Sequence, residues 1–262
     1  MQLNNIRHSV LHMVHYSKSS HVGACLSMVD ILFTLYFRIL NIDPQNPLKA
    51  DRDKFILSKG HGSAALYATL AERGYYPKSH LDLFYVDGGM LPGHLDMEAV
   101  PGVEASVGSL GHGLSIGVGM AISNRQTGNP GRIYVLLGDG ECNEGSVWEA
   151  VMLAATLKLT NLTVIVDYNK IQSFGRTNEV IDQTNMAERW SAFGWHAMEV
   201  NGHQIAELET SFHAVSNLPK VIIAHTVKGK GVSFMEDRLE WHYKSPNDEQ
   251  FAQALLELGV LR

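Results

Sequence analysis

Cysteine is scarce in this chain: the only two, Cys25 and Cys142, lie far apart and form no C-x-x-C pair. This scarcity argues against a disulfide framework and a thiolate metal site, and it favours two reduced thiols in a cytoplasmic protein. Long apolar runs are also missing, since residues 30–37 are too short and too interrupted to span a bilayer. Residues 1–16 mix polar and apolar side chains, unlike a signal peptide. We therefore expect a soluble, cytoplasmic protein that does not enter a membrane.

Positive charge is in deficit, because 21 Lys and Arg residues oppose 27 Asp and Glu residues, for a formal net charge of −6. No basic run offsets this balance, which argues against a protein that binds the phosphate backbone of nucleic acid. Internal repeats and low-complexity linkers are absent as well. A hydrophobic content of 45% is enough for a sizeable core, and the length fits one large α/β domain or two small ones.

Segments with strand and helix patterns alternate along the sequence. Two continuous apolar segments, residues 132–137 and 162–167, are typical of central strands in a parallel sheet. Residues 147–157 between them predict a crossover helix. We expect further strands at residues 54–58, 196–200 and 221–225, and further helices at residues 2–17, 27–39 (capped by Ser27), 63–73, 111–124 and 205–215. This order predicts an α/β fold, a doubly wound parallel sheet with helices on both faces.

Two oxygen-bearing side chains follow the two central strands. Asp139 lies in Gly138-Asp139-Gly140 just after the first strand, and Asn169 follows the second. Ligands of such sheets bind beyond the carboxyl ends of the strands, where both side chains would meet. Mg²⁺ prefers oxygen ligands and shares them with phosphate and water, while the two glycines allow a diphosphate to approach the backbone. The Gly-Asp-Gly tripeptide alone is more typical of a simple tight turn than of a ligand site.

The spacing of these residues resembles a known motif. Asn169, in Asp167-Tyr168-Asn169-Lys170-Ile171, stands 30 positions after Asp139, as in the thiamine diphosphate-binding motif. Gly-Asp-Gly-Glu-Cys-Asn-Glu-Gly at residues 138–145 narrows the resemblance to transketolases, and it extends from about His8 to Lys244. The resemblance implies thiamine diphosphate with Mg²⁺ (or Ca²⁺ or Mn²⁺) as cofactors. It also implies that the metal is held by Asp139, Asn169 and the Ile171 carbonyl.

Histidines of the channel are implied by the same resemblance. In transketolases they line the substrate channel and contact the diphosphate or the sugar hydroxyls, a task suited to imidazole, which donates, accepts and shuttles protons near neutral pH. Two positions next to these histidines depart from the family pattern: Ser20 replaces a glycine, and Tyr243 replaces a small residue. The matching histidines here are His21, His61, His94 and His242.

Further cofactor contacts also follow from the resemblance. Gly108 and Leu110 match the turn near the aminopyrimidine, where His112 replaces a more usual glutamine. Lys228 falls where a loop closes on the cofactor, although an exposed loop lysine is an equally good interpretation. Glu144 and Glu149 resemble the carboxylates that link the two active sites of the dimer.

One catalytic group of the family has no counterpart in the sequence. Transketolases activate thiamine diphosphate with a glutamate of a second, pyrimidine-binding domain, whereas residues 1–262 match a single diphosphate-binding domain. We therefore expect that domain on a separate chain, a C-terminal transketolase subunit, in a heterotetramer with two copies of each chain. The enzyme would be active only with this partner, on sugar phosphates that the sequence does not identify.

The leading hypothesis is the N-terminal subunit of a transketolase, which transfers a two-carbon ketol unit from a ketose (phosphate) donor to an aldose acceptor. Three alternatives stay open. The first keeps the cofactor but performs 2-oxo acid decarboxylation or a deoxyxylulose-phosphate synthase-like reaction. The second is a NAD-dependent dehydrogenase, loosely suggested by Gly111, Gly113 and Gly117, which do not directly follow a strand. The third is a non-catalytic binding or regulatory half.

Overall fold

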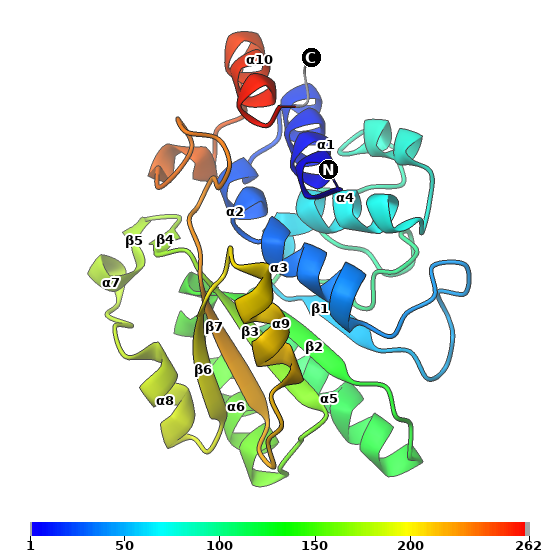
Figure 1. The fold of residues 1–262 in the computed structure, drawn as a ribbon, viewed down its shortest axis with the longest axis vertical. Coiled ribbons are helices and arrows are strands. Elements are labelled where there is room, and N and C mark those ends of the chain that lie inside the picture. The colour runs from blue at the N-terminus through cyan, green and yellow to red at the C-terminus, as the bar shows by residue number, and fades with distance from the viewer. Residues whose placement is uncertain (1, 260–262) are drawn as a thin grey trace.

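A five-stranded parallel sheet lies at the centre of the computed structural model, which describes residues 2–259 (Figure 1). Met1 and residues 260–262, at the ends of the expected domain 1–262, lie outside the described residues. The strand order is β1-β2-β3-β7-β6. Its strands are β1 (Lys54–Leu57), β2 (Ile133–Gly138), β3 (Leu162–Tyr168), β6 (His196–Asn201) and β7 (Lys220–His225). All five predicted strands are confirmed to within one residue at each end.

Two apolar layers sandwich the sheet, because alternate strand residues face opposite sides. Leu136 of β2 packs in one layer, while its neighbours Val135 and Leu137 pack in the other. The first layer contains α1 (Gln2–Ser17), α2 (Val22–Ser27), α3 (Val29–Thr34), α4 (Ser63–Arg73), α9 (Ile205–His213) and α10 (Asp248–Glu257). The second contains α5 (His112–Thr127), α6 (Gly145–Thr156) and α8 (Met186–Ala192). The expected helices on both faces are confirmed.

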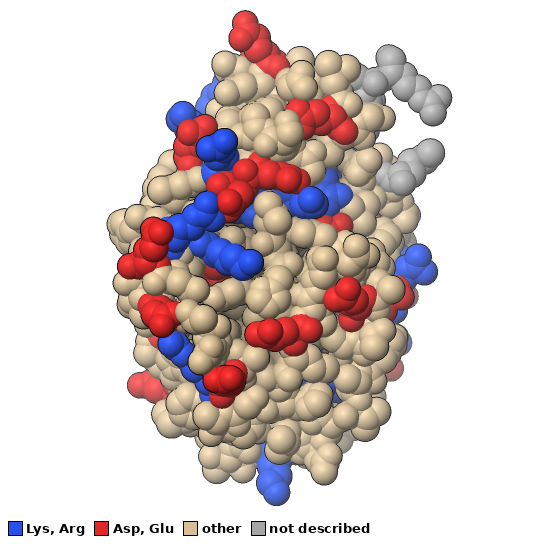
Figure 2. Space-filling view, turned by 60° about the vertical axis from the view of Figure 1, so that its left-hand side comes forward, with Lys and Arg blue, Asp and Glu red and all other residues tan. Residues whose placement is uncertain are grey.

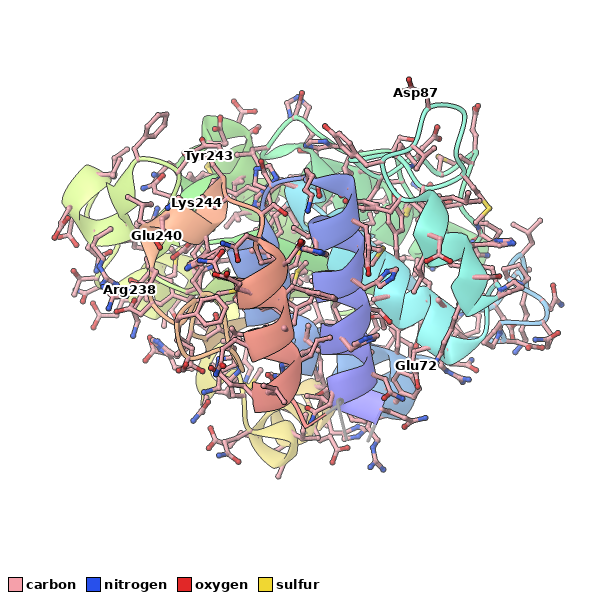
Figure 3. The ribbon with its side chains drawn as sticks, turned by 90° about the horizontal axis from the view of Figure 1, so that it is seen from above. Glu72, Asp87, Arg238, Glu240, Tyr243 and Lys244 are labelled. Carbon is pink, nitrogen blue, oxygen red and sulfur yellow. The ribbon has the colours of Figure 1, made fainter. Side chains whose placement is uncertain are left out.

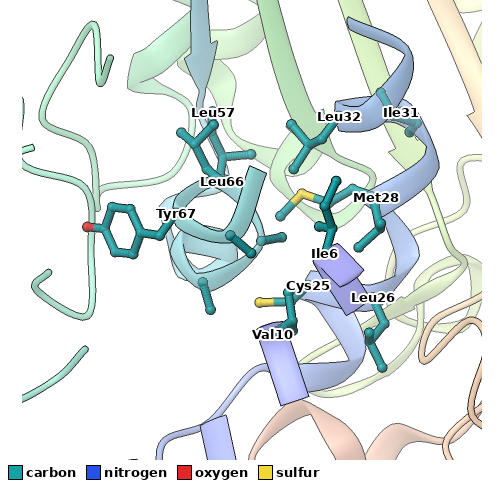
Figure 4. Close-up of a cluster of buried hydrophobic side chains, with 14 of the residues drawn as sticks. Ile6, Val10, Cys25, Leu26, Met28, Ile31, Leu32, Leu57, Leu66 and Tyr67 are labelled. Carbon is teal, nitrogen blue, oxygen red and sulfur yellow. The ribbon is translucent and has the colours of Figure 1, made fainter. Parts of the chain in front are cut away.

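Figure 4 shows the middle of the first layer, where Ile6 and Val10 of α1 meet Cys25, Met28 and neighbouring side chains. Cys142 belongs to the other layer, and both thiols are buried and free. The prediction of two unpaired cysteines is therefore confirmed. No helix within residues 2–259 is both long and apolar enough to cross a membrane.

The helix expected at residues 27–39 is different in the structure. Helical structure already begins at Val22, breaks at Met28 and continues through α3 into a π-helical turn, η1 (Leu35–Ile39). Ser27 ends α2 and does not cap a helix. Its single hydroxyl proton is shared between Oδ2 of Asp167 (2.6 Å) and the carbonyl of Ala24 (3.0 Å). Ser27 therefore binds the buried Asp167 carboxylate of the distant strand β3 and does not act as the predicted helix cap.

Several short elements were not expected from the sequence. Among them is α10, which begins with a capping box between Asn247 and Gln250. The others are α8, η2 (Gly60–Gly62), η3 (Lys78–Leu83), η4 (Gly140–Asn143), β4 (Ile171–Gln172), β5 (Gly175–Arg176), α7 (Thr177–Val180) and η5 (Leu239–His242). The β4–β5 hairpin, α7 and η5 lie beyond the carboxyl ends of the strands, on the left of Figure 1.

A buried ion pair joins two strands that are not neighbours. Lys59, just after β1, donates from Nζ to Oδ2 of Asp167 in β3 at 2.5 Å, and both side chains are at most 1% exposed. Burial raises the pKa of Asp167, but the Lys59 ammonium and the donated hydrogen bonds outweigh burial and lower this pKa below its usual value. The pair spans β2 and ties the edge of the sheet to its centre.

Loss of one partner of this pair should destabilise the protein strongly. We expect Lys59→Met to lower the free energy of unfolding by about 3–5 kcal/mol, because it leaves the Asp167 carboxylate buried without its cation. Arg176→Met is the matched control, since Arg176 pairs with Asp237 on the surface, and its cost should stay below about 1 kcal/mol. Urea unfolding followed by tryptophan fluorescence measures both, and equal losses would contradict the prediction.

Candidate active site

A cavity of about 370 Å³ opens beyond the carboxyl ends of β2 and β3. Thirteen of the fourteen site residues expected from the sequence line it, and Glu149 does not. Glu149 instead lies on an exposed part of α6. The thirteen are His21, His61, His94, Gly108, Leu110, Gly138, Asp139, Gly140, Glu144, Asn169, Ile171, Lys228 and His242.

Asp139 is a buried carboxylate at the end of β2, held by donors from two segments. Its Oδ1 accepts from the Gly140 amide (2.8 Å), and its Oδ2 accepts from the Lys170 amide (2.7 Å) and the Thr177 hydroxyl (3.0 Å). Burial raises the pKa of this carboxyl, and the nearby Asp167 raises it further, while the donors oppose the rise. A cation beside Asp139 would stabilise its charged form.

Asn169 and Ile171 reach the same cavity because β2 and β3 are neighbouring parallel strands, with Gly138 in register with Asp167. The Asn169 amide nitrogen donates to Oδ2 of Asp167 at 3.2 Å, and its oxygen accepts from the Ile171 amide at 3.1 Å. The carbonyl of Ile171 already accepts from a cation, the Lys228 ammonium, at 3.1 Å. One carboxylate, one amide oxygen and one carbonyl therefore face a common space.

Gly140 is required by close packing. A Cβ at this position would lie 2.8 Å from Cβ of Gln172, in the β4 strand that follows Ile171. Any side chain would therefore push away the segment that carries the Ile171 carbonyl. The glycine thus keeps the turn after β2 against the turn after β3.

Three imidazoles cluster on the opposite wall of the cavity. The ring centroid of His21 lies 5.1 Å from those of both His61 and His242, which are 5.8 Å apart. Burial, together with the cationic and imidazole neighbours, lowers the pKa of His21 to about 4 and that of His242 to about 3. The pKa of His61 is also well below its usual value, chiefly through burial. The three rings are therefore neutral at neutral pH, when each can donate one hydrogen bond and accept another.

Two of the residues that depart from the family pattern connect the histidine segments. The hydroxyl of Ser20 donates to the carbonyl of Tyr243 at 3.1 Å, beside the bond from the His21 amide to the His242 carbonyl at 2.9 Å. Tyr243 lines the cavity and is 61% exposed. Figure 3 shows Tyr243 with Glu240 and Lys244 at one side of the molecule, beyond the adjacent helices α1 and α10.

Lys228 is almost fully buried, so the alternative of an exposed loop lysine is wrong. Its ammonium lies 2.7 Å from Nδ1 of His242 and 3.1 Å from the carbonyl of Ile171. Burial first, and then the charge of Lys59, lowers the pKa of Lys228 to about 8. The side chain thus bridges the wall with the histidines and the wall with Asp139 and Asn169.

Glu141 is a site residue that the sequence did not identify. Its buried carboxylate accepts from the Ser58 hydroxyl (2.5 Å), the Gly111 amide (2.9 Å) and the Gly138 amide (3.0 Å). It therefore fixes the turn at Gly108–Gly111 against the turn after β2. A glutamate in a polar loop gives no sequence signal of burial, and this contact appears only in the folded chain.

Surface charges around the site are mixed. Figure 2 shows Lys and Arg side chains interspersed with Asp and Glu side chains on one face, without a continuous basic strip. The exposed Arg176–Asp237 pair and the partly exposed Lys230–Glu236 pair are examples of opposite charges in contact. The positive charge of the cavity comes instead from buried lysines.

Comparison with known proteins assigns a family to this arrangement. The model of the transketolase, thiamine diphosphate binding domain matches residues 1–261. An apulose-4-phosphate transketolase subunit of Phocaeicola vulgatus is 40% identical over 262 residues, covering 99% of this chain and 93% of that protein. The 6-deoxy-6-sulfo-D-fructose transketolase subunit SqwG of a Clostridium species is 41% identical, with coverage of 98% and 94%.

Solved structures give the same family and fold. Transketolase from Leishmania mexicana superimposes with a TM-score of 0.92 at 32% identity, covering 98% of this chain but 41% of that one. Transketolase from Campylobacter jejuni has the same TM-score and identity, with 42% of its chain covered. This chain thus spans about two-fifths of the length of these transketolases and nearly all of the separate subunits. It belongs to the transketolase family, as a thiamine diphosphate-binding subunit of an enzyme of ketol transfer.

Proposed function

We propose that this chain holds the diphosphate of thiamine diphosphate and Mg²⁺ in its cavity, as the N-terminal half of a two-chain transketolase. The observation that carries the proposal is the convergence of Asp139, Asn169, the Ile171 carbonyl and Lys228 on one space. The thiazolium carbon of the cofactor supplies the carrier of the two-carbon ketol unit. The protein side chains bind, orient and exchange protons around it.

The donor set fits a hard cation bound to a diphosphate. Asp139, the Asn169 amide oxygen and the Ile171 carbonyl would supply three oxygen ligands, and phosphate oxygens and water would complete an octahedral shell for Mg²⁺, or for Mn²⁺. Ca²⁺ also takes oxygen ligands of this kind. The carbonyl oxygen of Ile171 accepts from the Lys228 ammonium at 3.1 Å, so it is turned toward this space.

The other cofactor contacts are proposed from the walls of the cavity. Lys228 would offset diphosphate charge, and the turns at Gly138–Gly140 and Gly108–Leu110 would approach the cofactor through their backbones. Glu144 lines the cavity, and Glu149 lies on the exposed part of α6. We assign both to the contact with a partner chain that carries the pyrimidine-binding domain and its activating glutamate.

The histidines are assigned to the substrate. Neutral rings of His21, His61 and His242, with His94 on the same cavity, can donate to one oxygen of a polyol and accept from another. They would position a ketose donor and an aldose acceptor and move protons to and from their hydroxyl groups. Two relatives are named as transketolase subunits for apulose-4-phosphate and 6-deoxy-6-sulfo-D-fructose. We propose a sugar or sugar phosphate substrate here as well, in a cytoplasmic heterotetramer with two copies of each chain.

Asp139→Ala should weaken the binding of thiamine diphosphate in the presence of Mg²⁺ by about 10–100-fold, because a charge-assisted contact to the metal is lost. Isothermal titration of the assembled complex with Mg²⁺ and the cofactor measures the change. Asp87→Asn is the control, since Asp87 lies on an exposed loop that Figure 3 shows on the opposite side of the picture from Tyr243. Equal affinity of Asp139→Ala and the control would refute the metal assignment.

His61→Asn should lower kcat by about 10²–10⁴-fold, the usual contribution of a positioned proton donor or acceptor, with little change in cofactor affinity. His213→Asn, on the exposed end of α9, serves as the control. Ketol transfer measured under saturating cofactor separates the two effects. A loss of cofactor affinity without a loss of kcat would mean that His61 contacts the cofactor and not the substrate.

The partner is tested by gentle capture of the tagged chain from its native cells, followed by a ketol transfer assay with thiamine diphosphate and Mg²⁺. We expect a second chain to copurify, and we expect activity only in the pair. Activity of the isolated chain would mean that it carries its own activating carboxylate. A chain that comes alone, binds the cofactor and stays inactive would reduce the proposal to cofactor binding.

A further inference from the structure

A chain of buried polar contacts runs from α1 to the loop after β7, outside the cavity. The guanidinium of Arg7 in α1 lies 2.6 Å from Oδ2 of Asp30 in α3. The same oxygen lies 2.7 Å from Nδ1 of His203, in the connection between β6 and α9. The other ring nitrogen of His203 accepts from the backbone amide of Val227 at 2.8 Å. All of these side chains are buried or nearly so.

The contacts determine the tautomer of His203. The amide of Val227 can only donate, so Nε2 of the ring must carry a lone pair and the proton must reside on Nδ1. This proton points at the Asp30 carboxylate, which Arg7 holds in place. The carboxylate thus selects the tautomer that accepts from the loop, in the way that carboxylates orient histidines elsewhere.

Val227 immediately precedes Lys228, the residue that reaches into the cavity. The backbone on both sides of Lys228 is held from different elements. The Lys228 carbonyl accepts from the amide of Asp237, and the Gly229 amide donates to the carbonyl of Gly23, both at 2.9 Å. The contact with His203 fixes the backbone just before Lys228, and the other two bonds fix the backbone at and just after it.

We propose that His203 is a positioning residue for the cofactor site. By accepting the hydrogen bond of the Val227 amide, it holds the turn that directs the Lys228 ammonium to the Ile171 carbonyl and His242. Asp30 and Arg7 maintain the ring in the tautomer that this task requires. The link to the cofactor rests on the proposed function, in which Lys228 faces the diphosphate, whereas the link between His203 and the turn does not.

Two substitutions separate this role from a general contribution to stability. An asparagine amide occupies the place of Nδ1, so His203→Asn keeps a donor for Asp30 but cannot reach Val227. A glutamine amide extends to the place of Nε2, so His203→Gln can still accept from the Val227 amide. The two variants remove similar amounts of the ring and keep opposite contacts: His203→Asn keeps the one with Asp30, and His203→Gln keeps the one with the Val227 amide.

The test measures amide hydrogen exchange at Val227 and Lys228 in the full chain, and the affinity for thiamine diphosphate with Mg²⁺ in the complex with its partner. For His203→Asn we expect about tenfold faster exchange in this turn and about five- to tenfold weaker cofactor binding, while His203→Gln stays within about twofold of the unaltered protein. Unchanged exchange in His203→Asn, or equal effects of both variants on exchange and affinity, would overturn the proposal.

Lys228→Met separates a failure of this inference from a failure of the proposed function. Weaker cofactor binding in Lys228→Met, with normal binding in His203→Asn, would overturn the positioning role and leave the Lys228 contact standing. Normal binding in both variants would overturn both assignments. Weaker cofactor binding in both variants, with near-normal binding in His203→Gln, would establish that His203 acts on the cofactor site through the Val227 amide.

Discussion

The carboxylate of Asp167 is the interaction on which the rest of the site depends. It lies at the end of the central strand β3 and accepts hydrogen bonds from Ser27, Lys59, Asn169 and Thr226, which belong to four separate segments. A buried carboxylate is tolerated only when its charge and its lone pairs are satisfied. The requirement brings α2, the end of β1, the turn after β3 and the loop after β7 together. These segments carry or adjoin residues that line the cavity.

The parallel sheet explains why the cavity forms at this place. All five strands run in the same direction, so their carboxyl ends meet at one edge, and the turns after β2 and β3 lie side by side. Backbone amides and short polar side chains then supply oxygen ligands and hydrogen-bond donors. His21, which precedes α2, and the connections after β1 and β7 add the imidazoles and Lys228. The sheet fixes the metal side of the cavity, and the loops build the substrate side.

The turns around the cavity are held in place by hydrogen bonds from residues that lie outside the cavity or only partly line it. Glu141 ties the Gly108–Gly111 turn to the Gly-Asp-Gly turn, and His203 ties Val227 to α3 and α1 through Asp30. Both accept hydrogen bonds from backbone amides, and each fixes a turn that lies outside the helices and strands. Preorganisation of this kind lets a cofactor bind without first ordering the loops.

The sequence by itself determined the parallel sheet, the two cavity-lining turns and the cofactor class. Continuous apolar runs identify central strands, and the spacing of Asp139 and Asn169 follows from one crossover helix between them. Only the tertiary structure decided several other features. They are the burial of Lys228, the hydrogen bonds that converge on the Asp167 and Glu141 carboxylates, the ending of α2 at Ser27 and the contact of His203 with Val227. Most of the contacts that decide them join residues between 24 and 173 positions apart in the chain. No local periodicity records such contacts, because a polar side chain in a loop has the same sequence pattern whether it faces water or a buried charge.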